Sequence, residues 1–181
     1  MKKITMMMSA AGLAIMAMNA AHASDGTITF NGSVVATTCK INGGNSDVTV
    51  SLPKVGANTL AAAGATAGRT PFTLALTGCT PGEGNPAKVG VVFESGANVD
   101  QTTGRLNLDA ATGAATNLQI NVLNAQQQPI KVGFPGDQNS QVVAIGTDGS
   151  ATLNYFAEYY ATGTAKAGAA NSKVQYSLTY Q

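Results

Sequence analysis

The sequence is poor in the side chains that most catalytic and metal sites use. It has no tryptophan, a single histidine, and only 10% charged residues. That histidine, His22, lies in an N-terminal segment that we expect to be removed on export. A Ser-His-Asp triad and a histidine-liganded metal site are therefore excluded in the mature chain. We expect no enzymatic activity, no metal and no cofactor.

The first 23 residues are typical of a secretory signal peptide. Lys2 and Lys3 form a basic start, a Met- and Ala-rich apolar run follows, and Ala21-His22-Ala23 is a small-x-small cleavage site. The apolar run, about residues 4–17, is shorter than the roughly 20 residues that a membrane-spanning helix needs, which argues against a membrane anchor. Cleavage after residue 23 would leave a mature chain of residues 24–181.

The mature chain has the size of one domain, with room for a hydrophobic core. Because Lys2 and Lys3 leave with the signal, the ten Lys and Arg residues fall to eight, against nine Asp and Glu residues. The resulting charge, about −1, attracts neither nucleic acid nor an anionic membrane. We expect no nucleic-acid partner.

Only two cysteines are present, Cys39 and Cys79. In an exported chain such thiols usually pair, because the compartment is oxidising. We expect a disulfide between them, which would contribute about 4 kcal/mol in the chain-entropy model. The alternative, a thiol nucleophile, would need a base that the mature chain lacks.

Short alternating segments separated by turns fill the mature sequence. Gly, Asn, Asp and Pro clusters recur along the chain, and between them the apolar residues fall on every second position. A period of two places each apolar set on one face of a strand. The pattern predicts an all-β antiparallel sandwich or barrel. The clearest sets are Val48, Val50 and Leu52; Phe72, Leu74 and Leu76; Val89, Val91 and Phe93; Leu118, Ile120 and Val122; Ile130, Val132 and Phe134; and Leu153, Tyr155, Ala157 and Tyr159.

Few segments depart from this pattern. Residues 59–67 are rich in alanine but contain Gly64, so at most a turn or two of helix is expected there. Residues 110–116 and 161–171 consist of small residues and are expected to be loops.

Both ends of the mature chain carry one apolar face. Near the N-terminus the face consists of Ile28, Phe30, Gly32 and Val34; at the C-terminus it consists of Val174, Tyr176, Leu178 and Tyr180. The simpler interpretation of the first set is an ordinary first strand, buried in the core of its own domain. The second set continues almost to the last residue, although chain ends normally fray unless they are tied down.

Together these segments resemble the type 1 major pilins of the chaperone-usher class, over essentially the whole mature chain. The resemblance rests on residues 27–35, on Cys39 and Cys79, and on residues 155–163. It also rests on Tyr180 as the penultimate residue and on Gly168, the fourteenth from the end.

The resemblance implies an incomplete immunoglobulin-like sandwich that lacks its last strand. Its groove would be completed by residues 24–35 of a neighbouring subunit, with Ile28, Phe30, Gly32 and Val34 as the donor-strand residues. Before assembly a periplasmic chaperone would fill the groove by contacting Gly168, Val174, Tyr176, Leu178 and Tyr180. An outer-membrane usher would then exchange the chaperone strand for the donor strand, which is β-augmentation.

The implied product is a homopolymeric shaft on the cell surface, exported through the periplasm, supporting adhesion and carrying a tip adaptor or adhesin. Burying Ile28, Phe30 and Val34 would contribute roughly 1.5–3 kcal/mol each. Gly32 is expected where the groove is too shallow for a side chain. Residues 24–27 form a shorter lead than in many such pilins, so one end of the groove is less fully occupied.

Other functions stay open on the sequence. The chain could be a minor adaptor subunit of the same kind of fibre, or a self-contained secreted β-sandwich that binds sugar or protein through its loops. In the second case the N-terminal strand would pair within its own domain. A hydrolytic enzyme has only scattered carboxylates to offer, which solvated loop positions explain better: Glu94, Asp100, Asp109, Asp137 and Glu158.

Overall fold

The computed structural model describes residues 27–34, 39–80 and 85–181. The chain divides into two units, Met1–Ser33 and Val34–Gln181. The expected signal peptide and its cleavage site lie outside the described residues. Within the described part of the chain, no helix is both long and apolar enough to span a membrane.

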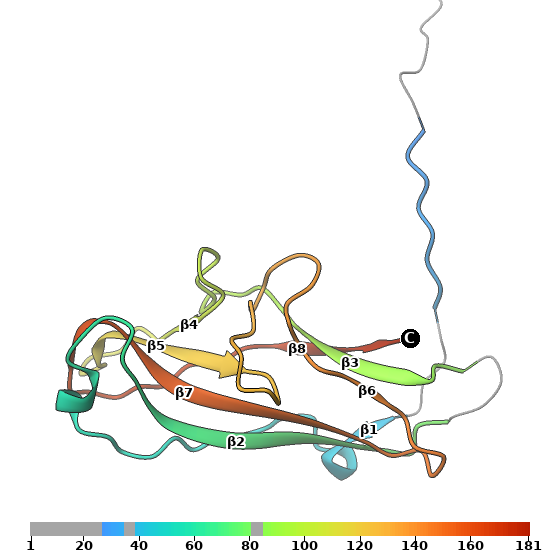
Figure 1. Ribbon diagram of the computed structural model, residues 1–181, viewed down its shortest axis with the longest axis horizontal. Helices are drawn as coiled ribbons and strands as arrows, with labels where there is room; N and C mark the ends of the chain where they lie inside the picture. The colour runs from blue at the N-terminus through green and yellow to red at the C-terminus, as the bar shows by residue number, and fades with distance from the viewer. Residues whose placement is uncertain (1–26, 35–38, 81–84) are drawn as a thin grey trace, which may run out of the picture. The chain divides into compact units, whose positions relative to one another are not determined.

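The second unit is built from two antiparallel sheets (Figure 1). The larger sheet has the strand order β1-β2-β7-β5-β4 and the smaller one β6-β3-β8. The expected all-β fold is confirmed. The strands are β1 (Lys40–Ile41), β2 (Thr66–Thr77), β3 (Lys88–Phe93), β4 (Leu106–Asn107), β5 (Thr116–Leu123), β6 (Val142–Ala144), β7 (Ala151–Lys166) and β8 (Tyr176–Tyr180); the 3-10 turns are η1 (Asn42–Gly44) and η2 (Ala57–Leu60).

The core contains many of the alternating apolar residues that the sequence indicates. Leu74 in β2, Val89 in β3 and Leu153 in β7 are all buried. Tyr155 is fully buried and its ring contacts Phe72 and Phe93, with centroid distances of 5.5 and 5.4 Å. Because Phe72 and Tyr155 belong to the larger sheet and Phe93 to the smaller one, this aromatic cluster joins the two sheets.

Strand β7 is longer than expected, because residues 161–166 continue it instead of forming a loop. Ala161 and Ala165 are buried, and Ala161 pairs with Leu118 of β5. Small side chains therefore mark a place where the strand packs closely, and composition alone misled the loop prediction. The 3-10 turn at Ala57–Leu60 and the start of β2 at Thr66 leave little room for helix in residues 59–67, as expected.

The strand expected at Ile130, Val132 and Phe134 does not form, although Ile130 and Val132 are buried. Three consecutive backbone amides here donate to three different segments: Ile130 to Val122, Lys131 to Gln138 and Val132 to Gly104. Gly133 follows with a positive φ of 75°. The alternation arises from a loop that is packed into the core, not from pairing with one neighbouring strand.

Candidate functional site

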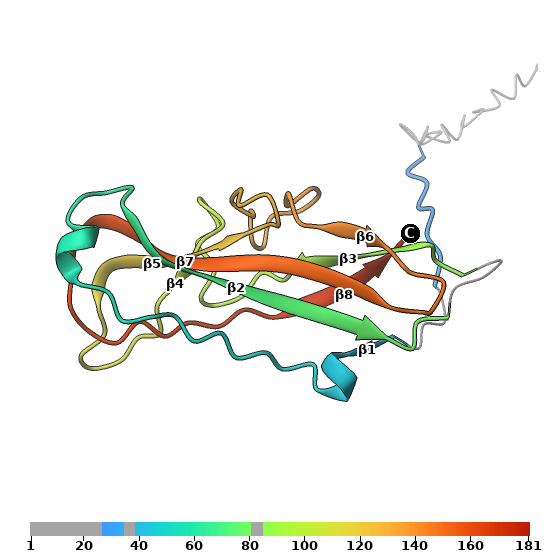
Figure 2. The same ribbon diagram turned by 60° about the horizontal axis from the view of Figure 1, so that its bottom comes forward.

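The second unit contains an apolar groove of about 950 Å³. One flank is formed by residues 48–57 and the other by residues 165–176, two segments that can be followed in Figure 2. Its floor is made of core residues from both sheets: Leu74, Phe93, Leu106, Ile120, Val122 and Tyr159. An elongated apolar groove between two lengths of backbone suits an extended peptide better than a compact polar ligand.

The first flank has the alternation of a strand but no strand partner. Val48, Val50 and Leu52 are half-buried between exposed neighbours, and within residues 39–80 no strand is assigned to this stretch. Among the hydrogen bonds of the described residues, only one joins residues 46–55 to another element. The Tyr176 hydroxyl donates it to the carbonyl oxygen of Ser46, at 2.6 Å.

Among the described residues, the backbone of the second flank forms hydrogen bonds only on the side that faces away from the first flank. The amide of Ala169 donates to Gly113, the amide of Ala115 donates to Ala169, and β8 pairs with β3. Strand β8 is therefore the edge of the smaller sheet. The chain end is fixed, because Gln181 and Lys88 exchange both backbone hydrogen bonds, at 2.8 and 3.0 Å.

The predicted C-terminal site residues form one surface. Gly168, Val174 and Tyr176 line the groove. Leu178 and Tyr180 continue the same half-buried face of β8 and pack against the core, but they do not line the groove itself. Their role as chaperone contacts stays a prediction.

Close contact with neighbouring backbone explains why residue 168 is a glycine. A Cβ built there would overlap backbone atoms of Gly113, Ala114 and Ala115. Only glycine lets the second flank approach the 113–115 loop closely enough for the hydrogen bonds at Ala169 to form.

The predicted donor residues are not buried. The side chains of Ile28, Phe30 and Val34 are 80%, 89% and 102% exposed, and no strand is assigned to residues 27–34. Gly32 has no heavy atom within 4 Å of a Cβ built at its position. Their role in strand donation also stays a prediction.

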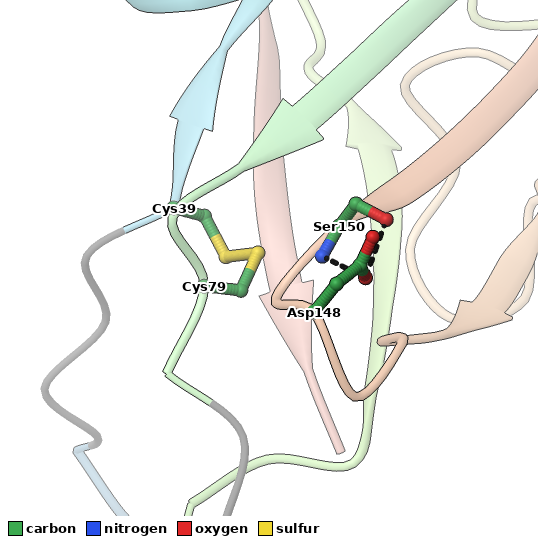
Figure 3. Close-up of a disulfide and its surroundings, with 4 residues drawn as sticks. All are labelled: Cys39, Cys79, Asp148 and Ser150. Carbon is green, nitrogen blue, oxygen red and sulfur yellow. Dashed lines mark hydrogen bonds between the residues drawn. A yellow bond between two sulfur atoms is a disulfide. The ribbon is translucent and has the colours of Figure 1, made fainter.

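The predicted disulfide is present. Cys39 and Cys79 are joined with a Cα–Cα distance of 4.1 Å, and the bridge ties the start of β1 to the end of β2 (Figure 3). The turn beside it carries Asp148, whose carboxylate accepts hydrogen bonds from the hydroxyl and amide of Ser150 and therefore has a lowered pKa. Gly149 of this turn lies against Cys79, whose amide donates to the Gly149 carbonyl at 3.0 Å.

Three of the carboxylates considered for hydrolysis, Asp100, Asp109 and Glu158, have structural partners. Asp100 accepts hydrogen bonds from the Gln119 side chain and the Thr102 amide, which lower its pKa. Asp109 accepts one from Asn98. Glu158 is buried on β7 and forms an ion pair of 2.7 Å with Arg69. These contacts hold loops and neighbouring strands together.

Sequence reasoning missed the first flank as part of the site. Val48, Val50 and Leu52 were expected to be an ordinary core strand, and Lys54 and Val55, which also line the groove, were not singled out. The alternation was visible, but whether a strand has a neighbour on each side depends on the tertiary arrangement.

Comparison with known proteins agrees with this geometry. Residues 52–181 match the family model described as type-1 fimbrial protein, A (FimA). The chain is 51% identical to the major fimbrial subunit SMF-1 of Stenotrophomonas maltophilia over 89% of this chain and 95% of that protein. It is 46% identical to the F17 fimbrial protein of Escherichia coli over 93% of this chain and 94% of that protein.

The fold is also that of solved pilus proteins. A chaperone-usher pilus structure that addresses rod uncoiling superposes with a TM-score of 0.63 at 23% identity, covering 87% of this chain and 96% of the other. At this identity the likeness shows the fold alone.

Proposed function

The chain belongs to the type-1 fimbrial protein family, and we propose that it is the major shaft subunit of a fimbria assembled by donor-strand exchange. Residues 27–34 of one copy would enter the groove of the next. The relatives support the choice of a major over a minor subunit, since SMF-1 is a major fimbrial subunit and is 51% identical along nearly the whole chain.

The proposal rests on two apolar surfaces that are both accessible to another chain: the groove, and the alternating side chains of the N-terminal segment. The groove has half-buried Val48, Val50 and Leu52 on one flank and Val174 and Tyr176 on the other. The N-terminal segment carries alternating apolar side chains that are almost fully exposed: Ile28, Phe30 and Val34. Exposed edges and apolar surfaces of this kind favour association with another chain.

A strand inserted between the two flanks would satisfy both surfaces at once. The edge of β8 and the unpaired backbone of residues 46–55 would each gain a partner, and every hydrogen bond would contribute roughly 1 kcal/mol net. Burial of the three donor side chains would contribute roughly 1.5–3 kcal/mol each. The joint would therefore be strong without any covalent bond.

Before assembly the groove would be an aggregation hazard, and a periplasmic chaperone strand would cover it. Release through an outer-membrane usher, cleavage of residues 1–23 and display on the cell surface complete the proposed route. A tip adaptor or adhesin would cap the fibre.

The test compares the oxidised mature chain, residues 24–181, with a variant lacking residues 24–35. Size-exclusion chromatography and heating in detergent would measure polymers. We expect polymers only from the full chain, and recovery of the shortened chain as a folded monomer when a peptide of residues 24–35 is added. The matched control is the same peptide with Phe30→Asp, which should not rescue.

A different outcome would support the self-contained binding domain. In that case the full chain is a stable monomer, the shortened chain is unfolded, and the added peptide does not restore it.

A further inference from the structure

The first flank of the groove is held to the rest of the second unit less firmly than the second flank. It is anchored at its two ends, by β1, which pairs with β2, and by the 3-10 turn η2, whose Leu60 is buried. Between these anchors its apolar side chains pack against the core, yet among the described residues no backbone hydrogen bond joins residues 46–55 to another element. A segment with so few hydrogen bonds has low local stability.

One side chain crosses the groove to this flank. The hydroxyl of Tyr176, in β8, donates a hydrogen bond of 2.6 Å to the carbonyl oxygen of Ser46. Tyr176 is itself firmly placed, because it pairs with Phe93 of β3. Beside this pair, the amide of Glu94 donates to the carbonyl oxygen of Gln175 at 2.8 Å. The Tyr176 hydroxyl therefore ties a loosely held segment to a strand that is fixed in its sheet.

The length of this bridge suits a groove that receives one strand. A strand inserted between two neighbours holds their backbones about 9.6 Å apart, which is twice the spacing of paired strands. A tyrosine side chain and one hydrogen bond can span such a gap. The Tyr176 ring packs against the core on the half-buried face of β8, so an inserted strand would pass over it.

We propose that Tyr176 is a positioning residue for strand donation, because its hydroxyl holds the first flank at the distance of one inserted strand before that strand arrives. The inference rests on the proposed function. The bond joins the two flanks to each other and not to the donor, so it adds no contact to the finished joint. It raises the fraction of subunits whose groove is ready to receive a strand, and strand entry becomes faster in proportion to that fraction.

The experiment compares the full mature chain with its Tyr176→Phe variant, which keeps the ring and removes only the bridging hydroxyl. The initial rate of polymer growth at a fixed subunit concentration measures strand entry. The rate at which finished polymers lose subunits in detergent at a fixed temperature measures strand release. We expect growth to be about fivefold slower in Tyr176→Phe, the factor that corresponds to one hydrogen bond of about 1 kcal/mol net, and release to be unchanged.

The matched control is Tyr160→Phe. Tyr160 follows Tyr159 on β7 and does not line the groove, and its hydroxyl has no hydrogen-bond partner among the residues that the structure describes. This variant also loses one tyrosine hydroxyl, and it should grow and release subunits at the rates of the unchanged chain.

Two results would overturn the inference while leaving strand donation intact. The first is equal growth rates for Tyr176→Phe and Tyr160→Phe. The second is faster release of subunits from Tyr176→Phe polymers, because the hydroxyl would then contact the donor strand itself. Polymers that persist without residues 24–35 would instead refute the proposed function.

Discussion

At the residue scale, the hydrogen bond from the Tyr176 hydroxyl to the carbonyl oxygen of Ser46 depends on the proton of that hydroxyl. Burial, together with the nearby negative charge of Asp47, raises its pKa above the usual value of 10.0. The neutral hydroxyl is thus favoured in the folded chain, and its contribution to stability is present below about pH 10 and lost as pH rises through the higher folded value.

We expect the midpoint of guanidinium unfolding to fall as pH rises above about 10. The fall should be smaller in Tyr176→Phe, because that variant has no proton to lose at this site. Burial also raises the pKa values of Tyr155 and Tyr159, and these two residues contribute to the pH dependence that remains in both proteins. Identical profiles for the two proteins would mean that burial and Asp47 do not raise the pKa of Tyr176 in the folded chain.

Gly168 allows a direct steric test. Gly168→Ala should lower the free energy of unfolding by about 2 kcal/mol, since the Cβ would push the second flank away from the backbone of the 113–115 loop. Denaturant titration measures the change. Gly96→Ala is the matched control, because a Cβ at position 96 meets nothing within 4 Å, and its effect should be close to zero.

At the scale of elements, the disulfide is the part of the structure that the sequence predicted most directly. It ties residue 39, next to β1, to residue 79, next to β2, across a separation of 40 residues. Replacing both cysteines by serine should cost about 4 kcal/mol, because the unfolded chain regains the freedom of that loop. Reduction of the unchanged protein should lower the free energy of unfolding by the same amount, and a much smaller effect of either would contradict the estimate.

The core strands could be predicted because alternation and burial coincide in them. Val89, Val91 and Phe93 are buried on β3, and Leu153, Tyr155 and Ala157 on β7, as the period of two requires. Alternation alone did not predict the structure of two other segments. Residues 130–134 pack into the core as a loop, and residues 46–55 lie along the groove without a neighbouring strand.

The two sides of the candidate site also differ in how well the sequence predicted them. The C-terminal face was predictable from Val174 to Tyr180, because it is an ordinary half-buried strand. The place of the opposing flank in the site was not predictable, because the sequence does not show that this segment has no neighbouring strand among the described residues. The Tyr176 contact with Ser46 spans 130 residues of sequence, and no local pattern indicates it.

At the scale of the whole molecule, stability and assembly are coupled. A strand that binds only the folded subunit shifts the folding equilibrium by mass action, so the folded state should become more stable as donor strands become available. The side chain that should matter most is Phe30, which is 89% exposed in the single chain and is the largest apolar residue of residues 27–34.

Phe30→Ala should therefore weaken the polymer by about 3 kcal/mol per joint, because truncation of a buried phenylalanine removes apolar burial and leaves a cavity in the groove. The measurement is the temperature at which polymers dissociate in detergent, with Thr29→Ala, on the opposite face of the segment, as the matched control. The variant joint should fail well below the temperature of the unchanged fibre. Equal dissociation temperatures for Phe30→Ala and the control would mean that the joint does not bury this ring, and the fibre would have to be held together by another surface.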